Sequence, residues 1–243
     1  MLIASVVFLF MACSNQSKVA VENRVDTLYT NTDGKGIKVV VNLEKGKAHN
    51  HPLYAIWIED MNENYIQTLY VSKYIATGIF GHADAGNGEW KTIPGESRRP
   101  SALPYWAHKR NVLASDGTYM PTPDKPVPDA YTGATPKSSF QLITKTDNPV
   151  NGKFRLLLEV NQPWDWNNYW HTDKYPDNRN YKMSSQPSII YVVTIDLNSN
   201  TKEYYLNPAG HGSFDGSNGL LYTNLSTLTS ALQIASKIKV IVE

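Results

Sequence analysis

The stretch PLYAIWIEDMNENYIQTLYVSKY, residues 52–74, predicts the fold of this chain. Residues 52–60 are apolar on both faces, a pattern typical of a strand that is buried inside a sandwich. A polar turn follows at residues 61–64, and residues 65–74 form a second run of strand-forming residues. Two such runs joined by a short polar turn predict a β-hairpin.

Further strand-forming runs occur along the whole chain. They are IKVVVNLE (37–44), FQLITK (140–145), KFRLLLEVN (153–161), PSIIYVVTIDL (187–197), TKEYYL (201–206) and KIKVIVE (237–243). The link TDNPVNG (146–152) predicts a second hairpin, and the turn NSN (198–200) predicts a third. About seven or eight strands joined mainly by hairpins predict an antiparallel sandwich of two sheets.

One helix is expected near the C-terminus, over LSTLTSALQIASK at residues 225–237. Ser226 or Thr227 is placed to cap its start. Apolar side chains recur there at helical spacing, at Leu225, Leu228, Leu232 and Ala235. Two long segments, 76–136 and 162–186, lack strand signals, and loops of that length in a compact domain are usually functional.

Composition excludes some classes of function. The 243 residues are 41% hydrophobic and 19% charged, which suits a globular body with a sizeable core. Lys and Arg total 23 against 22 Asp and Glu, and there is no long block of like charge. This balance gives no indication of nucleic-acid binding or of a polybasic membrane surface.

The N-terminal residues 1–13, MLIASVVFLFMAC, resemble a lipoprotein signal peptide. The apolar run is too short to span a bilayer as a helix, and it ends in Phe10-Met11-Ala12-Cys13, which is similar to a bacterial lipobox. Phe10 stands where leucine is usual, and no Lys or Arg precedes the apolar run. The resemblance implies cleavage before Cys13 and a lipid on its thiol.

Cys13 is also the single cysteine, so the mature body has no disulfide. Residues 14–34 are polar and are interpreted as a tether, which leaves 35–243 as one β-sandwich domain. We therefore expect a cell-envelope protein, a periplasmic or outer-membrane lipoprotein, that meets the membrane through its lipid anchor only.

The segment PDAYTGATP, residues 128–136, matches the target motif of bacterial flavin transferases, Asp-x-x-Thr/Ser-Gly-Ala-Thr/Ser. The constrained positions are Asp129, Thr132, Gly133, Ala134 and Thr135. In that system the last hydroxyl residue, here Thr135, takes FMN through a phosphoester. A threonine hydroxyl is a competent acceptor of phosphate once a transferase supplies a base and a metal.

A structural interpretation of the same residues stays open. Asp and Thr-Gly are ordinary turn residues, and Thr-Gly-Ala-Thr also recurs before a strand in immunoglobulin-like sandwiches. The strand-forming run at 140–145 follows almost directly, which fits that use.

A second resemblance covers roughly residues 35–243. The strand Tyr-Ala-x-Trp-x-Glu-Asp at 54–60 with its Thr-Leu partner, the TGAT segment, and the tail from 195 onward resemble a family of predicted periplasmic proteins of unknown function. That family is similar to the immunoglobulin-like domain of flagellar hook-capping proteins, and its members are associated with flavin-transferase and PepSY-type membrane redox genes. The resemblance implies an all-β, antiparallel immunoglobulin-like β-sandwich with long loops, one short C-terminal helix and a redox neighbourhood.

The loop PWDWNNYWH, residues 163–171, is the second candidate site. Its residues Trp164, Trp166, Trp170 and His171 suit stacking on a sugar ring, flanking of an isoalloxazine ring, or packing over the edge of the sandwich. The pairs Arg98-Arg99 and Lys109-Arg110 are able to grip phosphate, although short basic pairs are usually solvated.

The remaining motifs are weak. The pair His49-x-His51 would face one side of a strand, but no third ligand lies at a diagnostic spacing, so a surface turn is favoured and no metal is expected. His211 lies in a Gly-flanked loop, where a structural role is favoured over a ligand site. The sequence contains no nucleophile elbow, phosphate-cradling loop or paired-carboxylate signature, so an enzyme with its own active site is not expected.

Two functions are compatible with these sequence features. The leading hypothesis is an exported lipoprotein of a flavin-based electron-transfer system that carries covalent FMN on Thr135, with a flavin transferase and membrane redox proteins as partners. The alternative is a glycan- or protein-binding module on the envelope that uses the loop 163–171 and needs no cofactor.

Overall fold

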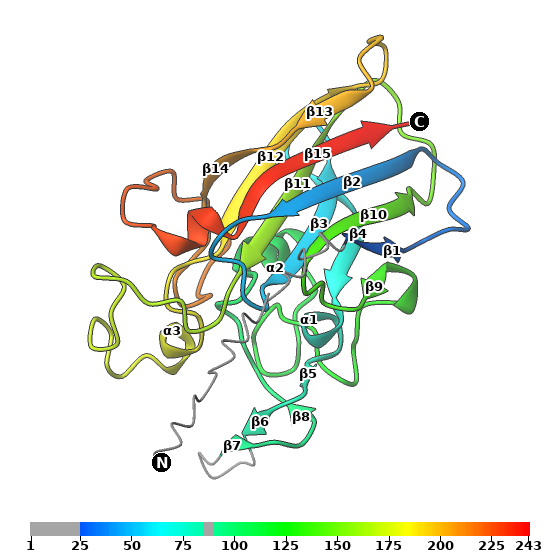
Figure 1. Ribbon diagram of the computed structural model, residues 1–243. Helices are drawn as coiled ribbons and strands as arrows, with labels where there is room; N and C mark the ends of the chain where they lie inside the picture. The colour runs from blue at the N-terminus through cyan, green and yellow to red at the C-terminus, as the bar shows by residue number, and fades with distance from the viewer. Residues whose placement is uncertain (1–24, 85–89) are drawn as a thin grey trace, which may run out of the picture.

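The computed structural model describes residues 25–84 and 90–243. The predicted signal peptide and Cys13 lie outside these residues. The first sheet contains, in spatial order, β1 (Val25–Tyr29), β10 (Ser139–Lys145), β2 (Lys38–Lys45), β15 (Ala235–Val242) and β13 (Glu203–Tyr205). The second sheet contains β14 (Asn207–His211), β12 (Ile189–Asp196), β11 (Lys153–Asn161), β3 (Leu53–Glu59), β4 (Tyr65–Ser72) and β9 (Thr132–Gly133). The two sheets face each other, so the predicted all-β sandwich is confirmed (Figure 1).

Strand β3 explains how the layers are built. All seven of its residues are buried. Tyr54, Ile56 and Ile58 belong to the main core, which they share with side chains of the first sheet. The alternate residues Ala55 and Trp57 belong to a second core on the outer face of the second sheet. The second sheet is therefore the middle layer of the molecule.

The long segment 76–136 supplies most of the outer layer. Helix α2 (Pro104–Arg110) buries its apolar residues, including Trp106, in the second core. Helix α1 (Lys73–Thr77) adds Ile75 and Ala76 to the same core. The other short elements are β5 (Ile79–Phe80), β6 (Ala83–Asp84), β7 (Trp90–Lys91), β8 (Gly95–Glu96), α3 (Arg179–Ser184) and the 3-10 turns η1 (Asp129–Tyr131) and η2 (Ser230–Gln233). The two pairs β5–β8 and β6–β7 lie at one end of the sandwich (Figure 1).

The predicted hairpins are only partly correct. Strands β3 and β4 pair antiparallel as expected. Strands β10 and β11, however, lie in different sheets, and so do β12 and β13. The burial patterns give the reason, because β10 alternates between buried and half-buried residues, whereas β11 is buried on both faces along most of its length. The doubly buried strand belongs in the middle layer, so the chain crosses between the sheets at both links.

The predicted helix at 225–237 is wrong. Only the 3-10 turn η2 forms there, and strand β15 already begins at Ala235. The apolar residues that suggested a helix instead pack into the main core from a loop, with Leu228 buried there. The ladder that pairs β15 with β2, with Val240 opposite Val41, outweighs the local helical spacing.

The predicted tether, 14–34, also needs correction at its C-terminal end. Residues Val25–Tyr29 form β1, which pairs in parallel with β10. The Thr30 hydroxyl then donates a hydrogen bond of 2.7 Å to the carbonyl oxygen of Leu69. The sandwich therefore includes residues before 35, and this parallel pair makes the first sheet mixed rather than purely antiparallel.

Candidate functional site

The motif at residues 129–135 lies on the edge of the second sheet, where η1 passes into β9. Strand β9 pairs in parallel with the end of β4, with Val71 opposite Thr132. Asp129 and Ala134 are exposed. The structure thus brings the whole motif to the surface of the molecule in one continuous segment.

Three motif residues have clear roles in the fold. A Cβ atom on Gly133 would lie 2.6 Å from Cε2 of Tyr70, so a larger residue does not fit there without a shift. The Tyr70 hydroxyl donates a hydrogen bond of 2.7 Å to the carbonyl oxygen of Ala134. The Thr132 hydroxyl donates to the carbonyl oxygen of Pro128 over 3.1 Å. These contacts support the structural interpretation for this part of the motif.

Thr135 differs from its neighbours. Its residue is half-buried, and its Oγ1 atom is buried without a hydrogen-bond partner among the described residues. An unsatisfied buried hydroxyl costs about 1–3 kcal/mol, and a valine of nearly the same shape would avoid that cost. The fold therefore gives no reason for a hydroxyl at this position, whereas the flavin interpretation does. The burial of Oγ1 also means that the segment has to open locally before the hydroxyl reacts.

A hollow of about 520 Å³ borders the start of the motif. Pro126, Pro128 and Tyr131 line it, together with Arg110. The Tyr131 hydroxyl donates to both carboxylate oxygens of Asp147, at 2.9 and 2.7 Å. Burial and this hydrogen bond raise the pKa of Tyr131 to about 12. The hollow gives the surface beside Asp129 a defined shape.

The loop 163–171 does not form one surface. Trp170 is only 6% exposed and contacts Tyr181, while Trp166 meets the same tyrosine edge-on at 5.6 Å between ring centroids. His171 is exposed. Trp164 is 51% exposed and lines a different place, a cleft. Packing therefore accounts for Trp166 and Trp170, whereas His171 and Trp164 lie at the surface in two separate places.

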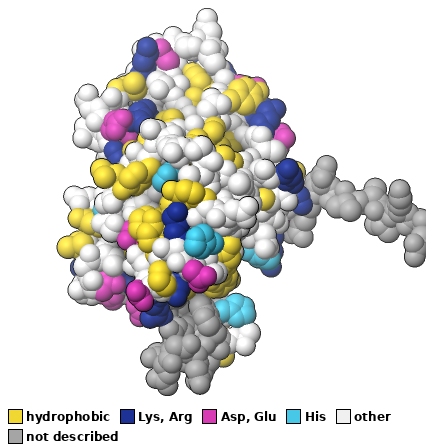
Figure 2. All heavy atoms as spheres, turned by 90° about the vertical axis from the view of Figure 1, so that its left-hand side faces the viewer, with side chains coloured by type: hydrophobic (Ala, Val, Ile, Leu, Met, Phe, Trp, Pro, Cys, Tyr) yellow, Lys and Arg dark blue, Asp and Glu magenta, His cyan; other side chains and the backbone are white. Residues whose placement is uncertain are grey.

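The cleft has a volume of about 680 Å³, and we call it the Arg99 cleft. The residues that matter for its chemistry are His51, Phe80, His82, Arg99, Lys137 and Trp164. They come from the connection before β3, from β5 and the segment after it, from the segment between β8 and α2, from the segment that follows the TGAT motif, and from the loop 163–171. Figure 2 shows a face of the molecule on which hydrophobic, basic and histidine side chains lie next to one another.

Arg99 is the central residue of this cleft. It is only 6% exposed. The carbon at the centre of its guanidinium group lies 4.2 Å from the ring centroid of Phe80 and 5.3 Å from that of Trp164. Burial lowers the pKa of Arg99 to about 10, so the group remains a cation at neutral pH. Contacts with two aromatic rings fix the position of this charge.

Two residues on the cleft have an uncommon backbone conformation. His51 has a φ of 54° and Trp164 has a φ of 59°. The left-handed region is rare for residues other than glycine and is least expected for a bulky side chain such as tryptophan. Such conformations cost free energy and tend to occur at functional sites. The coincidence of both residues at one cleft supports a functional role for it.

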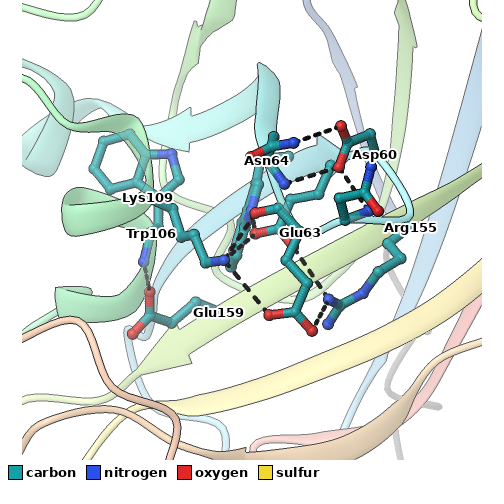
Figure 3. Close-up of polar contacts among 10 residues, drawn as sticks. Asp60, Glu63, Asn64, Trp106, Lys109, Arg155 and Glu159 are labelled. Atoms are coloured by element: carbon teal, nitrogen blue, oxygen red, sulfur yellow. Dashed lines mark hydrogen bonds and ion pairs between the residues drawn. The ribbon is translucent and has the colours of Figure 1, made fainter.

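A second polar cluster joins β3, β11 and α2 (Figure 3). The carboxylate of Glu59 is fully buried and accepts a hydrogen bond of 2.9 Å from Nε1 of Trp57. Arg155 lies 3.5 Å from it and Lys109 lies 3.7 Å from it. The same two cations pair with Glu63 in the hairpin turn, at 2.5 and 3.8 Å. Two carboxylates and two cations balance, so this cluster holds α2 and the hairpin on the second sheet.

Glu159 is the other buried carboxylate in this layer (Figure 3). It accepts hydrogen bonds from the backbone N–H groups of Trp106, at 2.7 Å, and Tyr105, at 3.2 Å. The Ser188 hydroxyl donates to it over 2.5 Å. Burial raises the pKa of Glu159 to about 7, against the lowering effect of these hydrogen bonds. Glu159 therefore caps the start of α2 from a distant strand.

The basic pairs are not solvated, contrary to the usual expectation. Arg98 donates to Asp116 over 2.6 Å and to the carbonyl oxygen of Pro121 over 2.6 Å. Arg110 stacks on Trp106, with 5.2 Å between its guanidinium carbon and the ring. Arg99 belongs to the cleft. The sequence named Arg99 only as one of four basic residues able to grip phosphate, and it did not indicate the cleft around it.

The histidine motifs have structural surroundings. His49 and His51 lie in the turns before β3 rather than on a strand. The ring of His211 contacts the carbonyl oxygen of Gly212 at 2.8 Å through Nδ1 and stacks on Tyr222. Among residues 25–84 and 90–243 no group of three or more His, Cys, Asp or Glu is arranged to hold a metal ion. In the same residues no helix is long and apolar enough to span a membrane.

Comparison with protein-family models, with curated proteins and with solved structures found no match to this chain. The fold and the two candidate sites define the protein only as an all-β sandwich with a motif on a sheet edge and a basic, aromatic cleft. Its function is therefore argued from these sites.

Proposed function

We propose that this chain is an exported flavin carrier that bears FMN covalently on Thr135 and works in extracytosolic electron transfer. The observation that supports this most is the Thr135 hydroxyl, which is buried without a hydrogen-bond partner among the described residues. It ends a complete Asp-x-x-Thr-Gly-Ala-Thr motif on an edge strand. Thr132, Gly133 and Ala134 have structural contacts, so Thr135 is the buried position of the motif whose side-chain chemistry the fold leaves unexplained.

The attachment is a phosphoryl transfer that a separate transferase catalyses. The Thr135 oxygen forms a bond to the flavin-side phosphorus of a flavin dinucleotide, the pyrophosphate bond breaks, and a nucleoside monophosphate leaves. The hydroxyl proton passes to a base of the transferase. Bound flavin supplies reversible one- and two-electron transfer. The chain itself supplies the acceptor hydroxyl and, through Asp129, an exposed recognition group.

The short edge strand favours this chemistry. Strand β9 has two residues and forms only the two register pairs with β4. Opening of such a short edge costs less than opening of a central strand, because few backbone hydrogen bonds and buried contacts are lost. The segment from Ala134 to Lys137 is therefore able to present the Thr135 hydroxyl to a transferase while the sandwich stays folded.

The cellular setting of the proposal rests on the N-terminal sequence. A signal peptide at 1–13 and a lipid on Cys13 would hold the domain at the cell envelope, where flavin transferases and membrane redox proteins meet their substrates. In this setting the domain would act as a carrier and not as an enzyme with its own substrate.

The test is an intact mass of the full chain produced together with a flavin transferase. We expect a gain of one FMN unit in the wild type and in Thr135→Ser, and none in Thr135→Val. The matched control is Thr144→Val, because Thr144 also has a buried hydroxyl without a partner but lies on β10, outside the motif. An unmodified wild type, or a Thr135→Val variant that still gains FMN, would overturn the proposal.

A further inference from the structure

We propose that this chain forms an ester crosslink between two of its own side chains. In this bond the hydroxyl oxygen of Ser230 replaces the amide nitrogen of Gln186, and Asp165 is the general base. Gln186 is only 1% exposed, and its Nε2 atom contacts both Ser230 and Asp165. None of these residues belongs to the motif at 129–135, so the inference does not depend on an attached flavin.

Ser230 is placed as a nucleophile beside a base. Its hydroxyl donates a hydrogen bond of 2.5 Å to Oδ1 of Asp165. Oδ2 of the same carboxylate is buried without a hydrogen-bond partner among the described residues, so it is able to hold a proton. Burial raises the pKa of Asp165, which makes its carboxylate a stronger proton acceptor. A serine hydroxyl is a weak nucleophile until an adjacent base activates it in this way.

The same hydroxyl lies against the carboxamide of Gln186. Nε2 of Gln186 donates a hydrogen bond of 2.6 Å to Oγ of Ser230. Because Nε2 is bonded to the carboxamide carbon over about 1.33 Å, this carbon lies within about 3.9 Å of the serine oxygen. Reacting atoms in a near-attack geometry are about 3–3.5 Å apart, so a small rotation of the serine side chain completes the approach.

Two donors bind the oxygen on which negative charge develops during the attack. The backbone N–H of Thr229 donates to Oε1 of Gln186 over 2.8 Å, and the side-chain amide of Asn167 donates to it over 3.0 Å. A backbone N–H only donates, so the Thr229 contact fixes which end of the carboxamide carries the oxygen. Asn167 is held in place because its own oxygen accepts from the backbone N–H groups of Tyr169 and Trp170. These two donors have the composition and the distances of an oxyanion hole.

The reaction needs no cofactor and no second substrate. Oγ of Ser230 forms a bond to the carboxamide carbon of Gln186, and the hydroxyl proton passes to Asp165. The bond between that carbon and Nε2 then breaks, and Asp165 gives the proton to the leaving nitrogen, which departs as ammonia. Ser230 is half-buried and follows the exposed Thr229, so the ammonia is released close to solvent. The ester itself stays on the buried side chain of residue 186, where little water reaches it.

The crosslink joins the two sheets of the sandwich. Gln186 precedes β12 of the second sheet, and Ser230 begins η2, which leads into β15 of the first sheet. The two residues are 44 positions apart, so the bond restricts the unfolded chain as a disulfide does. The chain has a single cysteine and forms no disulfide within itself, so an ester is a covalent link that remains open to it. The loop 163–171 thereby gains a chemical role through Asp165 and Asn167.

The test is mass spectrometry of the full, folded chain, which needs no flavin transferase. We expect the wild type to be lighter than its sequence by one ammonia, about 17 Da, because the amide nitrogen leaves. Trypsin cleaves after Lys202, between the two crosslinked residues, and we expect residues 183–202 and 203–237 to remain joined as one species. Fragmentation of that species places the bond. Loss of ammonia within a single peptide gives the same change in mass but no joined peptides, and that result would overturn the proposal, as would an unreduced mass.

Variants assign the roles of the side chains. Ser230→Ala removes the nucleophile, and we expect no joined peptides. Asp165→Asn keeps the shape of the base, and we expect the joined species to form at least about 100-fold more slowly. The matched control is Ser226→Ala, because Ser226 carries an exposed hydroxyl in the same loop that donates to Asn224, and we expect it to crosslink as the wild type does. Circular dichroism verifies that each variant is folded.

Thr229 provides the remaining hydroxyl next to Gln186, since its Oγ1 lies 3.3 Å from Oε1. A crosslink that persists in Ser230→Ala and is lost in Thr229→Val would overturn the assignment of Ser230. A crosslink that forms at the wild-type rate in Asp165→Asn would overturn the role of the base. These measurements do not involve Thr135, so this proposal and the proposed function fail separately.

Discussion

Gly133 lies so close to Tyr70 that a Cβ atom on the glycine would be 2.6 Å from Cε2 of the tyrosine ring. The same ring is fully buried, and its hydroxyl donates to the carbonyl oxygen of Ala134. Tyr70 therefore holds the TGAT segment on the edge of the second sheet, and these two contacts connect the candidate motif to the main core.

We expect Gly133→Ala to destabilise the protein by roughly 1–3 kcal/mol, because the Tyr70 ring has to move within a packed core. Urea denaturation measures this change. Gly81→Ala is the control, since the added Cβ there would meet only the Tyr74 hydroxyl, at 3.6 Å. Equal stability of the two variants would show that Tyr70 does not seat the motif.

The ion cluster predicts an asymmetric response to mutation. Arg155→Met leaves the fully buried Glu59 with only Lys109 as a cationic partner, and we expect a loss of roughly 3 kcal/mol. Lys153→Met removes an exposed ion pair with Asp196, and we expect a loss of less than about 1 kcal/mol. Chemical denaturation of both variants at low salt measures the difference. Similar losses would mean that Glu59 does not depend on Arg155.

Glu159 makes stability depend on pH. Burial raises the pKa of Glu159 in the folded protein from 4.5 to about 7, so the folded state holds its proton more tightly than the unfolded state does. The stabilisation is complete below about pH 4.5 and is lost as the pH rises to about 7, on the order of 3 kcal/mol in total.

Glu159→Gln removes this dependence of the stability on pH, because the glutamine side chain does not titrate. One end of the glutamine amide has to face a backbone N–H donor of α2, so the variant is less stable than the wild type at acidic pH. The gap between variant and wild type therefore narrows as the pH rises from 4.5 to 7. Unfolding free energies measured in steps across that interval test this, and a gap that stays constant would show that Glu159 titrates in its ordinary range.

Asn31 tests where the domain begins. Its side-chain amide donates to the carbonyl oxygen of Lys145 and to Oδ1 of Asp147, both at 2.8 Å. We expect Asn31→Ala to cost roughly 1–2 kcal/mol for these two hydrogen bonds. Asp33→Ala, at an exposed neighbouring position, serves as the control and is expected to be neutral. If Asn31→Ala leaves the free energy of unfolding unchanged, residues up to 34 act as a tether, as the sequence predicts.

The sequence predicts the strands well because their signals are local. The run at 153–161 coincides with β11, and the apolar faces of 52–60 correctly indicate a strand buried on both sides. Strand partners are less predictable, since they depend on which layer a strand joins. The alternating burial pattern of β10 and the burial of β11 on both faces indicate that the two strands belong to different layers. The short link between them nevertheless suggested a hairpin.

The candidate sites also differ in how far the sequence predicts them. The motif at Thr135 is contiguous, so its residues are visible in the sequence. The Arg99 cleft combines five distant segments, and neither the positive φ of Trp164 nor the approach of Lys137 leaves a local signal. Glu59 and Glu159 do leave a local signal in the sequence. Each is an acidic residue within a largely apolar strand-forming run, which indicates a buried and partnered carboxylate.

The most direct test of the central claim is the site of the modification itself. The full chain is produced with a flavin transferase and digested with trypsin, and the peptide that ends at Lys137 is fragmented in a mass spectrometer. The account predicts a flavin phosphate on Thr135 and on no other hydroxyl of that peptide. An unmodified peptide, or a flavin on Thr132, would contradict it.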